Sequence, residues 1–352
     1  MITIVSKPED LNYTLSLPRL RYTSDKASTT VTLYRDANKI LEEKYFPYDA
    51  ETPLELDYDN MIHGLQSIDY PKTEEIITHA NAAGSYKIVI TDSDESKEIN
   101  FTAMKGFYYA QPIDLGLFFS TTWLNVPFVF RRMVRSFQPL HLTAFARQKI
   151  NLKVIAVFEG GGTETFAFGT MVSGKVQTVD VSPYLIQQRS ANKIIEYTVF
   201  GTDDAGKLNM QQRSYVIEPI DVYRDDYFVF QNRLGGWESI ALTGQKTNTY
   251  KNVQSLALMD KRTIRYADEK TRTVKKNTGY ITGHDNRTLI IEMINSEQCY
   301  HLLDGAARLI NFKEPTVDLT ENTLNEVDLE FTYSDPLLAN PRIETRPNYL
   351  TI

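Results

Sequence analysis

The 352-residue chain has little of the chemistry that builds redox, metal or disulfide sites. Its one cysteine, Cys299, excludes an intrachain disulfide, and we interpret it as a buried thiol because the nearby His301 alone does not make a catalytic pair. The histidines are scattered without metal-ligand spacing, so the sequence predicts no metal site and no cofactor. They are His63, His79, His141, His284 and His301.

The sequence also lacks the short motifs of common enzymes. Gly160, Gly161 and Gly162 are not followed by a helix with Lys-Ser/Thr, which excludes a phosphate-binding loop. His-Glu-x-x-His, Gly-x-Ser-x-Gly and Cys-x-x-Cys are absent. The acids Asp203-Asp204 and 92–95 fit turn formation better than the paired carboxylates of a glycosidase. We therefore expect no catalytic residues and no enzymatic activity.

Neither a basic excess nor a long apolar run is present. The formal net charge of −7 argues against a nucleic-acid partner. The longest apolar stretch, 113–134, is interrupted by Asp114 and Pro127, so no membrane span is expected. The N-terminal residues do not form a signal peptide, and we expect synthesis in a cytoplasm without export.

What the chain does contain favours β structure. Hydrophobic residues make up 42% of the sequence, with 21 Tyr and 17 Phe, and these residues suit half-buried strands. The length predicts two or three domains. We predict a mainly β protein: two N-terminal β-sandwich domains of immunoglobulin or fibronectin type, followed by a β-rich α+β C-terminal domain.

The first domain is predicted over residues 1–110, from short stretches of alternating polarity separated by turns. Residues 59–68 fit a short helix, and residues 71–80 a short helical or irregular segment. The expected strands are 2–5, 11–17, 29–34, 42–48, 54–58, 86–90 and 98–104.

Residues 111–139 are predicted to be an irregular aromatic junction between domains. Two interpretations stay open: burial against its own neighbouring domains, or contact with another subunit. Its interface candidates are Trp123, Phe128, Phe130, Arg131, Arg132 and Arg135.

The second domain is predicted over 140–222 and the third over 223–336, with an extended C-terminal arm at 337–352. The glycines at 160–162 predict a hairpin between strands 150–158 and 164–169. In the third domain, the pattern over 289–295 and 297–303 does not decide between helix and strand. The remaining expected strands are 142–146, 176–181, 194–200, 212–217, 227–230, 239–243, 255–259, 263–266, 271–276, 307–313, 316–319 and 325–333, with a helical turn at 182–189.

The segment 226–291 is the most distinctive part of the sequence. An apolar run ends at Gly235-Gly236, and Trp237 and a second apolar run follow. Because glycine adopts positive φ freely, the pair predicts a tight hairpin turn. A basic strip comes next, for which we consider a solvated hairpin face, a contact with an acidic partner, and a nucleic-acid contact. It comprises Lys261, Arg262, Arg265, Lys270, Arg272, Lys275 and Lys276.

Residues 232–240, Asn-Arg-Leu-Gly-Gly-Trp-Glu-Ser-Ile, with Thr243-Gly244 resemble a run found in uncharacterised tail-associated proteins of Bacteroidetes phages and prophages. Residues 275–280, Lys-Lys-Asn-Thr-Gly-Tyr, and 328–334 are similar to later elements of those proteins. Trp237 and Glu238 stand where that family commonly has a smaller residue and Asp.

The resemblance implies a structural virion component of the tail tip or baseplate, with no catalytic residues. We expect it to assemble symmetrically with copies of itself and with other tail or baseplate proteins. One alternative is an adhesin that binds host-surface glycan through Trp123, Trp237 and tyrosine-rich loops. A second alternative is a glycan-degrading tail enzyme.

Overall fold

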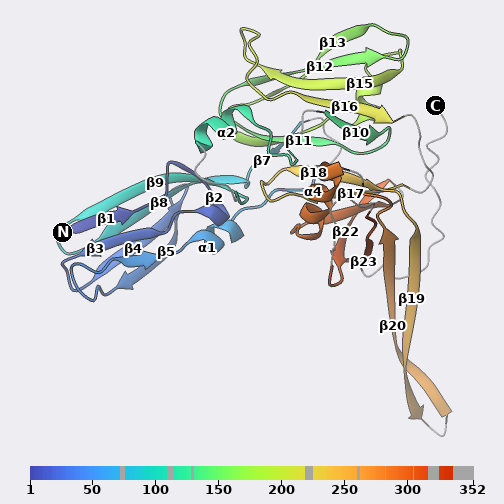
Figure 1. Ribbon diagram of the computed structural model, residues 1–352. Coiled ribbons are helices and arrows are strands. Elements are labelled where there is room, and N and C mark those ends of the chain that lie inside the picture. The colour runs from blue at the N-terminus through green and yellow to red at the C-terminus, as the bar shows by residue number, and fades with distance from the viewer. Residues whose placement is uncertain are drawn as a thin grey trace.

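The computed structural model describes residues 1–71, 76–108, 114–127, 131–218, 225–259, 262–281, 283–303, 305–315 and 325–335, without the side chains of 252–254, 256–259, 262–271 and 284. Five sequence predictions therefore lie outside the described residues: the positions of Phe128, Phe130 and Lys261, the strand at 316–319, and the C-terminal arm at 337–352. The described chain is mainly β, arranged as two sandwiches and a larger sheet (Figure 1).

The first sandwich packs a three-stranded sheet against a five-stranded sheet. Its core forms because alternate strand residues point inward: Ile2, Leu20 and Tyr22 from one sheet meet Val31 and Ile88 from the other. The helix α1 spans Asp59–Gly64, which confirms the short helix predicted within 59–68. The strand predicted at 11–17 is wrong in its second half, because Thr14–Ser16 forms a 3-10 turn. The strand orders are β1 (Ile2–Ser6), β3 (Leu20–Ser24), β6 (Leu54–Leu56), and β2 (Leu11–Tyr13), β9 (Ser96–Met104), β8 (Ala83–Thr91), β4 (Thr29–Arg35), β5 (Asn38–Tyr45).

The second sandwich also has a three-stranded and a five-stranded sheet. The glycine hairpin is confirmed, because Val157 pairs with Thr163 across it. The helix α3 spans Pro183–Gln187, as the sequence predicted. The strand orders are β11 (His141–Ala146), β14 (Lys175–Asp180), β7 (Ile76–His79), and β10 (Arg131–Arg135), β16 (Arg213–Glu218), β15 (Ile194–Thr202), β12 (Ile150–Phe158), β13 (Thr163–Met171).

Strand β7 corrects the prediction for residues 71–80. We expected a helical or irregular segment of the first domain, but Ile76–His79 is a strand that pairs with Val176–Val179 of β14 in the second sandwich. The chain therefore leaves the first sandwich, completes a sheet of the second and returns as β8. Such an exchange gives the two domains a shared backbone hydrogen-bond ladder, so they are not independent units.

The segment between the two sandwiches is more regular than predicted. The helix α2 spans Leu115–Thr121, and Asp114 caps it by accepting a hydrogen bond from the Leu117 amide at 3.0 Å. The same segment ends in β10, an edge strand that runs parallel to β16.

The third domain is one seven-stranded sheet with the helix α4 (Gly283–Ile294) packed on it. Residues 289–294 are therefore helical, and Leu289, Ile290 and Met293 are buried on one side, as the i, i+1, i+4 spacing of an amphipathic helix requires. The strand order is β18 (Trp237–Leu242), β17 (Asp226–Gln231), β21 (Cys299–Leu303), β22 (Ala306–Phe312), β23 (Asp328–Tyr333), β20 (Arg262–Asn277), β19 (Lys246–Met259).

Two strands of this sheet continue beyond it as a ribbon. The sequence predicted three short strands at 255–259, 263–266 and 271–276, whereas β19 and β20 are 14 and 16 residues long. Their outer parts project away from all three domains (Figure 1). Local turn signals inside this segment are weak, and the two strands pair continuously from Lys246–Lys276 to Met259–Arg262.

Candidate functional site

The glycine motif lies where the three domains meet. Asn232 organises the turn: its side-chain carbonyl accepts hydrogen bonds from the Leu234 and Gly236 amides, both at 2.9 Å. Its amide group donates to the Leu124 carbonyl at 2.8 Å, which ties the turn to the segment between the sandwiches. An Asn four residues before the second glycine of the turn is the sequence signal that would have identified this role.

Gly235 and Gly236 allow the turn to form and also allow its backbone to approach the backbone of neighbouring segments closely. A Cβ on Gly235, which has φ +81°, would lie 2.5 Å from the Lys105 carbonyl of the first domain. A Cβ on Gly236 would lie 2.0 Å from the Leu124 carbonyl. The structure therefore extends the predicted hairpin turn: Gly236 is required because two backbones touch there.

Trp237 follows this turn and is fully buried in a core shared by all three domains. Its ring lies edge-on to Tyr70 of the first domain, at 5.6 Å, and tilted against Tyr300 of the third, at 6.0 Å. The shared core also takes side chains from the first sandwich, α2, the second sandwich and β17. These include Tyr13, Ile68, Met104, Phe118, Phe119, Phe145, Val176 and Val229.

Trp123 is also fully buried, in the core of the second sandwich, and its indole nitrogen donates to the Gln211 carbonyl at 2.6 Å. Of the two interpretations of the junction, burial against the chain's own domains therefore holds for Trp123, because the ring has no exposed surface to offer as an interface. For the same reason, Trp123 and Trp237 cannot form the exposed binding surface that the adhesin alternative assigned to them together with the tyrosine-rich loops.

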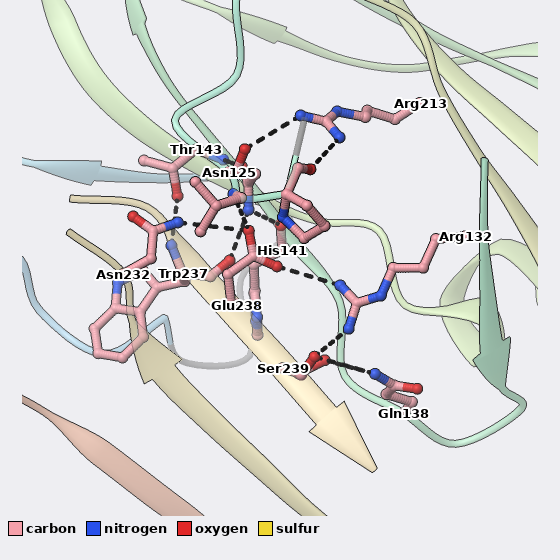
Figure 2. A network of polar contacts seen from close by, with 12 residues as sticks. Asn125, Arg132, Gln138, His141, Thr143, Arg213, Asn232, Trp237, Glu238 and Ser239 are labelled. Carbon is pink, nitrogen blue, oxygen red and sulfur yellow. Dashed lines mark hydrogen bonds and ion pairs between the residues drawn. The ribbon is translucent and has the colours of Figure 1, made fainter. Parts of the chain in front are cut away.

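A buried polar network lies beside the shared core (Figure 2). The Glu238 carboxylate accepts a hydrogen bond from the Val126 amide at 2.8 Å and lies 3.2 Å from the Arg132 guanidinium. Arg213 donates to the Asn125 carbonyl at 3.2 Å and the Pro127 carbonyl at 2.8 Å. Burial raises the pKa of Glu238 to about 7, and the Arg132 charge opposes that rise.

The cavity beside this network measures about 20 Å³, which is the space of roughly one water molecule. It is lined by residues of the network, including Asn125, Arg132, Arg213 and Glu238. A glycan ring does not fit there. The network therefore joins the third domain to the second. The raised pKa of Glu238 comes from burial between these domains, and the cavity beside it is too small for a sugar substrate.

The predicted arginines of the junction act within the chain. Arg132 is mostly buried against Glu238 and also donates to the Ser239 carbonyl. Arg135 pairs with Glu218 at 2.7 Å and Asp225 at 3.1 Å. For Arg132 and Arg135 these ion pairs agree with the first of the two interpretations of the junction, contact with its own neighbouring domains, and their contact with another subunit stays a prediction. Arg131 pairs with Glu196 at 2.7 Å but stays exposed.

A second polar contact joins the first and third domains. Glu297 lies 3.0 Å from the Lys105 ammonium and 2.6 Å from the His63 imidazole, whose other nitrogen contacts the Thr14 hydroxyl at 2.7 Å. The His63 hydrogen bond, together with Lys105, lowers the pKa of Glu297 to about 2 against the effect of burial. Every pair of domains is therefore joined by polar as well as apolar contacts.

The base of the ribbon is fixed by the buried carboxylate of Asp226. It lies 3.0 Å from Lys246, 2.8 Å from Lys276 and 3.0 Å from His301. Burial favours the neutral acid, but the hydrogen bond from His301 and the charges of His301, Lys246 and Lys276 hold the pKa of Asp226 well below its usual range. These residues are up to 75 positions apart, so no local sequence pattern could have grouped them.

Lys276 and Arg272 are therefore structural, which corrects their assignment to a partner surface. Lys276 is 1% exposed, and Arg272 lies between the rings of Tyr250 and Tyr333, 5.7 and 5.1 Å from their centres. Lys275 is exposed but pairs with Asp328 at 2.8 Å. The backbones of Arg262 and Arg265 lie in the outer part of β20.

Residues 243–244 and 277–279 connect the two strands of the ribbon at this base through backbone hydrogen bonds. Thr243 donates its amide to the Thr278 carbonyl at 3.1 Å, and Thr278 in turn donates its amide to Val327 at 2.9 Å. Asn277 accepts from the Gly279 amide at 2.8 Å. The Thr-Gly and Asn-Thr-Gly sequences therefore hold the start of β19 and the end of β20 together.

The outer ribbon has only two strands among the described residues. β23 pairs with β20 over Thr273–Asn277 alone. From Lys251–Thr271 to Met259–Arg262 the two strands pair only with each other. At about 3.3 Å per residue this ribbon is roughly 30 Å long, and the register shift after Ser255 places a bulge at Tyr266.

The acidic loops considered for glycan cleavage are turns. Asp92 accepts from the amides of Asp94 at 2.8 Å and Glu95 at 2.9 Å, and Asp203 accepts from the amides of Ala205 and Lys207. Cys299 is a free, buried thiol whose pKa burial raises, as predicted. Within the described ranges, no cluster of three or more His, Cys, Asp or Glu has the arrangement of a metal site. None of the described helices is both long and apolar enough to cross a membrane.

No protein-family model and no curated protein matches the chain. Among solved structures it is similar to a tandem of titin immunoglobulin domains, with 10% identity and a TM-score of 0.23 over 62% of this chain and 96% of that chain. The YadV chaperone gives 10% identity and a TM-score of 0.20 over 60% and 98%. Drosophila OTK extracellular domains 3–5 give 9% and 0.20 over 93% and 95%. These similarities concern β-sandwich architecture alone.

Proposed function

We propose that the protein is a structural component of a phage-like tail, in the distal tail or baseplate, and that it acts by assembling with copies of itself and with neighbouring virion proteins. The proposal combines the resemblance of residues 232–244 and 275–280 to tail-associated phage proteins with one structural observation, the projecting ribbon of β19 and β20 (Figure 1).

The ribbon carries the assembly part of the proposal. An isolated two-stranded hairpin is marginally stable in water, and its unpaired strand edges attract further strands. Here about 30 Å of ribbon extends from the body with both edges unpaired among the described residues. Contact with another subunit would give these edges hydrogen-bond partners.

The fixed base favours the same role. A ribbon that positions a neighbour must leave the body in one direction, and Asp226, Lys246 and Lys276 bind the two strands to the sheet at this point. The three domains behind it share one core and two polar contacts. A body whose domains are joined in this way, with the ribbon extending from it, suits repetition around an axis.

Deletion of the gene from a phage or prophage that carries it tests the proposal. We expect induced particles with absent or incomplete tails by electron microscopy, restored by the full chain supplied from a plasmid. Complete, infectious tails after deletion would contradict a structural role. Loss of host attachment with complete tails would favour the adhesin alternative instead.

A further inference from the structure

The first sandwich presents an acidic and aromatic edge that the shared core does not use. Its residues are 46–59, which run from the end of β5 through the outer strand β6 into α1. Five of these fourteen residues are acidic and none is Lys or Arg. β6 has three residues and pairs only with β3 among the described strands, so its outer edge is unpaired. The acidic residues are Asp49, Glu51, Glu55, Asp57 and Asp59.

The side chains of this edge suit a cationic partner. Tyr48 is 93% exposed and Phe46 is 68% exposed. The Lys44 ammonium already lies 5.5 Å from the centre of the Phe46 ring, so that face accepts a cation. Arg19 pairs with Glu55 and, at 3.2 Å, with Asp57. Among the described residues, Glu51 has no ion-pair partner, which leaves negative charge on the loop.

The outer ribbon has the complementary charge. Residues 251–271 contain five Lys or Arg and three Asp or Glu, a positive segment in a chain of net charge −7. The ribbon also offers unpaired backbone edges, and the edge at β6 offers another. Within one chain the ribbon and the first sandwich point in different directions (Figure 1), so only a second copy can bring them together.

We propose that the outer ribbon of one copy docks along residues 46–59 of a second copy, with the backbone of β20 beside β6 and the basic segment of the ribbon against the acidic and aromatic edge. This inference rests on the proposed function and names the partner surface for its assembly. Strand addition supplies the backbone contacts, and charge sets the specificity. Because arm and edge are different surfaces, the contact is head-to-tail and repeats into a ring or a filament.

Charge reversal on full-length protein tests the contact. The edge variant carries Tyr48→Lys and Glu51→Lys, and the ribbon variant carries Arg265→Glu and Lys270→Glu. We expect each to raise the dissociation constant of assembly at least about tenfold, measured by light scattering over a concentration series. A chain with all four substitutions restores complementary charges and should recover to within about threefold of the wild type. Thr163→Lys with Glu164→Lys, on the exposed edge of the second sandwich, is the matched control and should assemble normally.

The outcomes separate this inference from the proposed function. A wild-type chain that stays monomeric overturns both. Normal assembly of the edge variant, with assembly lost in the ribbon variant, overturns the docking surface while assembly through the ribbon stands. Normal assembly of the edge variant with lost binding to host-surface glycan would make 46–59 a glycan site and overturn the inference.

Disulfide trapping gives an independent readout. A chain with Glu51→Cys and Lys270→Cys should form an oxidised ladder of linked copies on a denaturing gel, and each single variant should not. The native Cys299 is buried and does not compete. A double variant that assembles but forms no ladder would show that ribbon and edge do not meet.

Discussion

Replacing Gly236 by alanine should break the contact between the third domain and the segment that joins the two sandwiches. The added Cβ would lie 2.0 Å from the Leu124 carbonyl oxygen, where ordinary contacts begin at 3.4 Å, so one backbone must move by more than an ångström. That movement strains the hydrogen bonds from Asn232 to Leu124 and from the Gly236 amide to Asn232. With about 1 kcal/mol for each bond and about 1–3 kcal/mol for overpacking, we expect a loss of about 3–5 kcal/mol.

Two matched variants separate close approach from turn conformation. Gly160 has open space around it, and Gly160→Ala should change stability by less than about 0.5 kcal/mol. Gly161 also has open space but φ +83°, so Gly161→Ala should cost about 1–2 kcal/mol through conformation alone. Gly236 has no positive φ, so its cost would come from the contact with Leu124.

The assay is thermal unfolding by circular dichroism, with limited proteolysis to detect separation of the domains. For 352 residues that unfold as one cooperative unit, a loss of about 3–5 kcal/mol lowers the unfolding midpoint by roughly 4–7 °C. An unfolding midpoint for Gly236→Ala equal to that of Gly160→Ala would refute the role of this glycine in holding the domains together.

The remaining predictions concern the other contacts of the junction. Trp237→Ala should cost about 3–5 kcal/mol and loosen the three domains, measured by urea unfolding and small-angle scattering, with Trp237→Phe as the milder control. Burial raises the pKa of Glu238 from 4.5 to about 7, so the folded state holds a proton that the unfolded chain releases, and stability falls as pH rises through that window. Glu238→Gln should remove this fall between pH 4.5 and about pH 7, and an unchanged slope of stability against pH would contradict the burial. The pKa of Glu297 is lowered to about 2, so its contribution to the free energy of unfolding is present above pH 4.5 and is lost as pH falls toward 2. Glu297→Gln should flatten the dependence of stability on pH in that range. An acid unfolding curve identical to that of the wild type would count against the contact with His63.

The sequence predicted the β class and many elements because those signals are local. The strands 29–34 and 150–158 alternate in polarity, and the side chains that the pattern assigns to the core are buried. Pro183 at the first position of α3 likewise marks a helix start. Each of these features depends on residues within about ten positions of one another.

The junction and the ribbon depend on distant residues, and the sequence did not reveal them. Ile76–His79 becomes a strand because β14, about 100 positions later, offers a free edge. Arg132 and Trp123 looked available for a partner because Glu238 and Gln211 are far away in sequence. Gly236 could be predicted as a turn residue, but its contact with Leu124 is tertiary.

The central claim, assembly through the ribbon, is tested most directly by removing the ribbon and leaving its base intact. Tyr250 and Arg272 face each other across β19 and β20, so deleting 251–271 and joining them by Asn-Gly closes a two-residue hairpin. Light scattering should show an oligomer, either a ring or a filament, for the full chain and a folded monomer for the trimmed chain, with equal unfolding midpoints. An oligomer of unchanged mass in the trimmed chain would contradict the claim.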